Sequence, residues 1–208
     1  MLVNLFSCKQ QHNKLTDIDR SIVPYYNTPD FTPVWTTDKS ITDTLHVISN
    51  FHFIDQNGDT ISNINFKNKI YIADFFFTHC PSICPKMTAT IKAVYEHYKN
   101  NLRVAFLSHS VTPEIDNVSV LKKYAISNGV DNDQWHFVTG NKNDIYTIAR
   151  KSYFAEQQLG FSYDSTQFLH TENLILIDKN GHIRGLYNGT LPAEIPRIIE
   201  DIDLLLQE

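Results

Sequence analysis

The strongest constraint on the fold is an almost unbroken apolar run from Lys69 to Phe77. Such a run is typical of a strand in a parallel sheet, because helices cover both faces of such sheets. The next segment, Pro85 to Tyr98, has apolar residues at helical spacing, namely Met87, Ile91, Val94, Tyr95 and Tyr98. We expect this helix to begin at Pro85, since proline suits the first helical position. The two segments predict a strand–helix unit of an α/β domain.

The rest of the chain alternates in the same way. Strands are expected over residues 46–55, 102–108, 135–139, 174–178 and 182–187, and helices over residues 117–127, 144–151 and 192–206. This order predicts an α/β, thioredoxin-like fold with a central mixed β-sheet flanked by helices. The connection from Ser152 to His170 is long, which indicates an inserted loop or hairpin before the last strands.

The N-terminal part differs in composition from the rest. Residues 1–44 are expected to form a tether and an extended arm whose Phe31 and Trp35 pack on the compact domain of residues 45–208. The first eight residues end in Leu5-Phe6-Ser7-Cys8, which resembles the cleavage box of bacterial lipoproteins, where the cysteine is acylated. This segment lacks a basic region, and its apolar part is shorter than the usual ~7–15 residues. An unmodified cysteine is the alternative.

Composition excludes several classes of protein. Of the 208 residues, 42% are hydrophobic and 20% are charged, which indicates a packed core rather than disorder. The net charge of −5, without any basic run, argues against nucleic acid as a partner. No apolar stretch approaches the ~20 residues of a membrane span. Three cysteines are too few for a disulfide scaffold, and two of them, Cys80 and Cys84, lie close together.

This cysteine pair lies where the apolar strand gives way to the helix. The positive end of the helix dipole favours the thiolate form, which binds soft metals and attacks disulfides. Three residues separate Cys80 from Cys84, whereas thioredoxin-type oxidoreductases usually have two. This spacing permits a disulfide and also lets two sulfur atoms surround one metal ion. Both uses remain open at this point.

A family resemblance rests on the run Thr78-His79-Cys80-Pro81-Ser82-Ile83-Cys84-Pro85. It resembles the signature of the Sco/SenC family, whose members are needed for cytochrome c oxidase assembly. The resemblance covers roughly residues 45–206 and includes the segments at 107–114 and 174–178. In that family two cysteines and a distant histidine bind copper. It therefore implies that Cys80, Cys84 and His170 hold one copper ion, as Cu(I) or Cu(II).

Three further residues lie near the cysteines in the sequence or could act as ligands: His79, His109 and Met87. His79 is adjacent to Cys80, and a contorted loop would be needed for both to bind one ion. His109 is expected to follow a strand and to make a loop hydrogen bond, with support of the site as the alternative. Met87 is expected in the core, because its helical spacing with Ile91 outweighs a role as a thioether ligand.

The resemblance implies a copper chaperone of the bacterial cell envelope. Its client would be the binuclear copper site of cytochrome c oxidase subunit II, outside the cytoplasmic membrane, with Cys8 as a lipid anchor. The alternative is a thiol–disulfide oxidoreductase with Cys80 and Cys84 as its redox pair. Such enzymes usually have a cis-proline before the strand that matches 174–178, and no proline occurs in residues 168–173. A peroxidase is less favoured still, because no arginine lies near the cysteines in the sequence.

Overall fold

The computed structural model describes residues 22–155 and 171–208. The strands are β1 (Tyr25–Tyr26), β2 (Pro33–Val34), β3 (His52–Asp55), β4 (Thr60–Ser62), β5 (Ile70–Phe76), β6 (Val104–Ser110), β7 (Trp135–Thr139), β8 (Asn173–Ile177) and β9 (Ile183–Asn188). The α-helices are α1 (Lys39–Thr42), α2 (Ile83–Tyr98), α3 (Val118–Ser127), α4 (Lys142–Lys151) and α5 (Ile195–Leu205), and two short 3-10 helices are η1 (Asn63–Phe66) and η2 (Pro192–Glu194).

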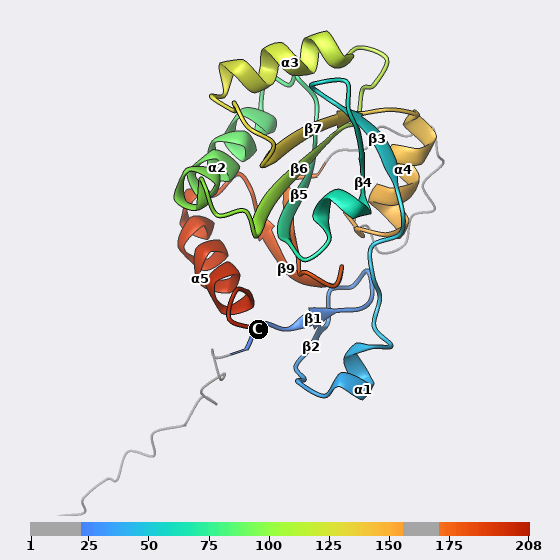
Figure 1. Ribbon diagram of the computed structural model, residues 1–208, viewed down its shortest axis with the longest axis vertical. Coiled ribbons are helices and arrows are strands. Elements are labelled where there is room, and N and C mark those ends of the chain that lie inside the picture. Colours follow the sequence, from blue (N-terminus) through green and yellow to red (C-terminus); the bar gives the residue numbers. More distant parts are fainter. Residues whose placement is uncertain (1–21, 156–170) are drawn as a thin grey trace, which may run out of the picture.

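These strands form one mixed sheet in the order β2-β1-β9-β8-β5-β6-β7-β3-β4 (Figure 1). At its centre β5 pairs in parallel with β6 and antiparallel with β8. The β9-β8-β5-β6 arrangement, with α2 connecting β5 to β6, is that of a thioredoxin-like fold. The predicted thioredoxin-like α/β fold is therefore confirmed, and residues 156–170 of the expected inserted loop or hairpin lie outside the described residues.

Helices cover both faces of this sheet, as the apolar run in β5 requires. Ile70, Ile72 and Phe76 face a core that includes side chains of α2, α3 and α5. Tyr71 and Phe75 face the opposite core, to which α4 contributes. Figure 1 shows α2 and α5 on one side of the sheet and α4 on the other. Each fully buried large side chain contributes about 1.5–3 kcal/mol to folding, so both cores stabilise β5.

The N-terminal arm joins the edge of the sheet. Strand β1 pairs antiparallel with β9, with Tyr26 opposite Ile183, and Val23 is buried in the core of α2 and α5. The buried Arg184 guanidinium donates to the Val23 carbonyl oxygen at 2.6 Å. Tyr25–Tyr26 and Pro33–Val34 are thus part of the sheet, although they precede the expected start of the compact domain at residue 45. Backbone pairing of this kind leaves little trace in composition.

Two aromatic residues of this arm behave differently. Phe31 packs edge-on against Tyr26 and Phe154, as predicted. Trp35 was expected to pack in the same way, but 46% of its surface is exposed. Its neighbours Pro33 and Val34 form an edge strand of only two residues, which offers little surface to pack against.

Several element boundaries differ from the predicted ones. The strand expected from residue 46 begins at His52. The residues before it do not pair with β4, because the Ile48 N–H donates instead to the Gly181 carbonyl oxygen at 2.9 Å. The helix expected to begin at Pro85 begins at Ile83, so that prediction was wrong. Proline is tolerated in the first turn because the first four N–H groups of a helix have no partner within it. Cys84 therefore lies inside α2.

Candidate functional site

The two cysteines are brought together where β5 ends and α2 begins. Cys80 lies in the intervening loop, where its N–H donates to the Phe77 carbonyl oxygen at 3.3 Å. Cys84 lies in the first turn of α2 and is buried. The Cys84 N–H donates to Cys80 Sγ at 3.4 Å. The sequence predicted this pairing, because it placed both residues at one strand–helix junction.

The sulfur of Cys80 takes the place of a helix cap. Ser82 precedes α2, but its side chain makes no capping hydrogen bond. Burial alone would raise the pKa of the Cys80 thiol. Hydrogen bonds from the Cys84 side chain and from the backbone N–H groups of Ser82, Cys84 and Ile83 outweigh burial and lower that pKa below its usual value. Cys80 is therefore the thiol that ionises more readily.

Cys84 has the opposite character. Burial raises the pKa of its thiol to about 12, and the hydrogen bond with Cys80 and the negative charges of Cys80 and Asp74 act in the same direction. The pair thus combines one accessible, acidic thiol with one buried, weakly acidic thiol. Such asymmetry suits chemistry in which one sulfur reacts with a partner and the other follows.

A buried carboxyl group near Cys84 was missed by the sequence reasoning. Asp74 is 2% exposed in the middle of β5, and Ser108 Oγ donates to its Oδ1 at 2.5 Å. Trp135 Nε1 in turn donates to Ser108 Oγ at 2.9 Å. Burial raises the pKa of Asp74 to about 7. The available signal was an acidic residue inside an otherwise apolar strand, which is costly to bury without a role.

The other candidates from the sequence are placed as follows. Met87 is completely buried in the core, as predicted. His79 is exposed, and its Nδ1 lies 2.9 Å from Thr78 Oγ. His109 was expected in a loop but lies inside β6, where it is fully buried and stacks on Phe75. Burial lowers the pKa of His109 to about 3, so the ring is neutral there.

The described residues supply two of the three predicted ligands. Within residues 22–155 and 171–208, no group of three His, Cys, Asp or Glu side chains is arranged to hold a metal ion. His170 and Cys8 lie outside the described residues. The chemistry of the donor pair fits copper, because two sulfur ligands next to a helix N-terminus suit a soft cation.

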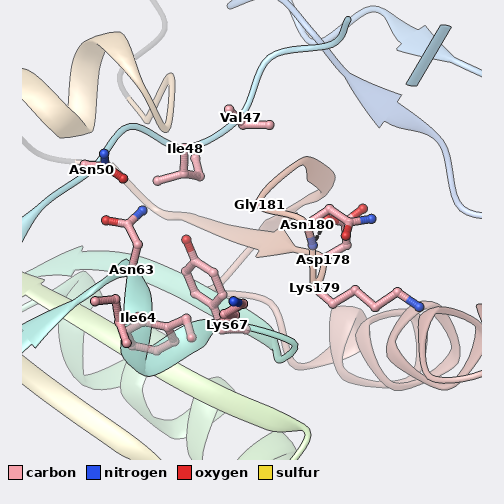
Figure 2. A pocket seen from close by; sticks show the side chains of 12 residues that line it. Val47, Ile48, Asn50, Asn63, Ile64, Lys67, Asp178, Lys179, Asn180 and Gly181 are labelled. Atoms are coloured by element: carbon pink, nitrogen blue, oxygen red, sulfur yellow. Dashed lines mark hydrogen bonds between the residues drawn. The ribbon is translucent and has the colours of Figure 1, made fainter. Parts of the chain in front are cut away.

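A separate pocket lies at the other end of the sheet. Its volume is about 370 Å³, and Figure 2 shows Val47 and Ile48 on one side with Ile64 and Lys67 on the other. Tyr71, near the start of β5, also lines it, whereas Cys80 follows the end of that strand. The pocket therefore does not belong to the cysteine site.

No helix in the described part of the chain is long and apolar enough to cross a membrane.

The fold and the site together define the class of this protein. A cysteine pair between the central strand and the following helix of a mixed sheet makes it a thioredoxin-like protein with a dithiol site. A family model described as SCO1/SenC matches residues 39–207. The chain belongs to the SCO1/SenC family, as the resemblance predicted. A SCO1 protein homolog of Bacillus subtilis (strain 168) is 34% identical over 154 residues, which cover 73% of this chain and 79% of the relative.

The solved structures that are similar to this chain include three of the Sco family. A SCO1/SenC family lipoprotein from Bacillus anthracis is 30% identical with a TM-score of 0.67, over 77% of this chain and 95% of that one. BsSco is 31% identical with a TM-score of 0.66, over 78% of this chain and 95% of that one. It is described as a member of the Sco family of cytochrome c oxidase assembly proteins in which a disulfide switch was identified. Bradyrhizobium japonicum ScoI with copper bound is 25% identical with a TM-score of 0.58, over 76% and 97%.

Proposed function

We propose that this protein binds one copper ion through Cys80, Cys84 and His170 and acts as a copper chaperone. The observation that carries this proposal is that Cys80 and Cys84 meet at the N-terminus of α2, where the Cys84 N–H donates to Cys80 Sγ at 3.4 Å. Family membership supports it, since a relative was crystallised with copper bound. The ion is the cargo, and it supplies the redox chemistry of the receiving protein.

The electrostatics of the pair support the binding of a soft cation. N–H groups directed at Cys80 Sγ favour the thiolate, which is the form that coordinates metal. Cys84 is protonated in the copper-free protein, and coordination requires that this proton leaves. Copper binding should therefore release about one proton or more per ion at neutral pH.

An anaerobic Cu(I) competition titration against a chromophoric chelator tests this proposal. One copper per chain is expected for the reduced protein, with loss of tight binding in Cys80→Ser and in Cys84→Ser. His170→Ala should weaken binding and change the Cu(II) spectrum, whereas the matched variant His79→Ala should leave both unchanged. Unchanged affinity in His170→Ala would remove that residue from the site.

The client and location follow from the same family argument. We propose delivery of copper to the binuclear site of cytochrome c oxidase subunit II, on the outer side of the cytoplasmic membrane. Acylation of Cys8 would hold the domain at that surface, and a structurally similar relative is described as a lipoprotein. Mass spectrometry of the protein from cells should find a lipid-modified Cys8, and an intact Met1 terminus would contradict this.

A second candidate function is thiol–disulfide exchange with the same client. The asymmetric pKa values of the pair favour it. The Cys80 thiolate would attack a client disulfide, and a mixed disulfide would form as one client sulfur leaves as a thiolate. Cys84, after losing its proton, would then attack Cys80, release the reduced client and leave a Cys80–Cys84 disulfide. If this is the main role, His170→Ala should not affect turnover.

A further inference from the structure

Four hydrogen-bond donors converge on one buried carboxylate beside the cysteine loop. Asp116 lies between β6 and α3, and its side chain is fully buried. Its Oδ2 accepts from Ser110 Oγ at 2.7 Å, from Thr112 Oγ at 3.1 Å and from the Thr78 N–H at 3.1 Å. Its Oδ1 accepts from Thr78 Oγ at 2.5 Å. A carboxylate can accept about four hydrogen bonds, so these four donors use most of its capacity.

Two of these donors come from the cysteine loop itself. Thr78 precedes Cys80 by two residues, and it is bound to Asp116 through both its backbone and its side chain. The other two donors, Ser110 and Thr112, belong to the end of β6 and the loop that follows it. Asp116 therefore joins the loop after β5 to the end of β6 and the loop that follows it, where the pairing of the two parallel strands ends at Phe76 and Ser110.

This connection acts where the sheet no longer fixes the backbone. The ladder between β5 and β6 ends at the pair Phe76 and Ser110, and the Val111 N–H then donates to the Phe76 carbonyl oxygen at 2.8 Å. Beyond Phe76 the chain must turn so that Cys80 Sγ meets the N-terminus of α2. Groups that hold a reactive side chain within a fraction of an ångström are usually locked by such supporting hydrogen bonds.

We propose that Asp116 is a positioning residue that fixes the Thr78–Cys80 loop so that both sulfur atoms can bind one metal ion. This inference rests on the proposed copper function for its purpose, although the loop contact can be measured without copper. The hydrogen bonds of Asp116 to the described part of the cysteine loop are made with Thr78, so it would act on the cysteines through that residue.

Three variants separate positioning from simple stabilisation. Asp116→Asn offers one acceptor oxygen and an NH2 group that only donates, so it cannot accept from all four groups. Thr78→Val removes one donor on the cysteine loop. Thr112→Val is its matched control, because it removes one donor to the same carboxylate from outside that loop.

The measurements are hydrogen exchange of the residue 78 amide in the copper-free protein, Cu(I) affinity by chelator competition, and melting temperature. Asp116→Asn should speed that exchange about tenfold and weaken the Cu(I) affinity about tenfold. This is the order of magnitude of the equilibrium change expected when a hydrogen bond to a charged group is lost. Thr78→Val should show a smaller change in the same direction. Thr112→Val should stay within about twofold of the wild type in both, because its loss leaves the cysteine loop anchored.

Each outcome decides the inference. Wild-type exchange and affinity in Asp116→Asn would overturn it, and so would equal effects in Thr78→Val and Thr112→Val that follow melting temperature alone. If Asp116→Asn fails to fold, the two threonine variants carry the same comparison. If the wild type binds no Cu(I), the proposed function fails, and hydrogen exchange at residue 78 still decides whether Asp116 holds the loop.

Discussion

The two thiols of the reduced protein should differ greatly in their rate of alkylation. The pKa of Cys84 is raised to about 12, whereas that of Cys80 lies below the usual 9.0. At pH 7 the thiolate fraction is then about 10⁻⁵ for Cys84 and above about 10⁻² for Cys80, at least a thousandfold difference. A more basic thiolate is the better nucleophile, so the Cys84 thiolate should react about 20-fold faster than the Cys80 thiolate once it has formed. Cys80 should thus react at least about 50-fold faster, and the burial of Cys84 increases the ratio.

Pulse labelling with iodoacetamide under anaerobic conditions measures this ratio by peptide mass spectrometry. Cys80→Ser and Cys84→Ser give each rate alone, and protein unfolded in urea should label at both positions equally. The Cys80 rate should rise with pH with a midpoint below the usual 9.0, because its pKa is lowered. Comparable rates for the two cysteines in the folded protein, or faster labelling of Cys84, would refute the proposed asymmetry.

Three further changes test the surroundings of the site. Asp74→Asn should raise the melting temperature more at pH 8 than at pH 4. The pKa of the Asp74 carboxyl is about 7 in the folded state, against an ordinary value of 3.8. The buried carboxyl therefore lowers the free energy of unfolding as pH rises from about 4 to 7, by at most about 4 kcal/mol. An equal effect at both pH values in thermal melts would contradict this. Met87→Ala should lower the free energy of unfolding by about 2–5 kcal/mol in urea titrations, while copper stoichiometry stays at one; loss of copper would instead make Met87 a ligand. Arg184→Ala should lower the free energy of unfolding by about 3–5 kcal/mol, because it leaves the buried Asp178 without its 3.0 Å ion pair. Limited proteolysis should then cut within residues 22–34, and unchanged protection of that segment would show that Arg184 does not hold the N-terminal arm.

Much of the central fold was predictable because its signals are local. The apolar run of β5 indicated burial on both faces, and the helical spacing from Met87 to Tyr98 indicated α2. The pairing of β1 with β9 was not predictable in this way. It joins residues more than 150 positions apart through backbone hydrogen bonds, and two-residue strands carry no periodicity.

The candidate site likewise contains residues that were predictable from local sequence and residues that were not. Cys80 and Cys84 were predictable because their chemistry and their place at a strand–helix junction are visible in one short run. The roles of Asp74 and Asp116 depend on partners from other strands, such as Ser108 and Ser110. An isolated acidic residue in the sequence gives no sign of which donors will meet it. His109 was misplaced for a related reason, since a polar residue near a strand end is ordinarily taken for a loop residue.

The error over the start of α2 has a consequence for function. Because the helix begins at Ile83 and not at Pro85, the N–H groups of Ser82, Ile83 and Cys84 lie at its N-terminus without helical partners, and Cys80 Sγ accepts from them. The same groups would favour a thiolate that holds copper and a thiolate that attacks a disulfide. The dithiol alone therefore does not separate the two proposed functions. They differ in whether a third ligand is needed, so the effect of His170→Ala on copper affinity and on thiol exchange distinguishes them.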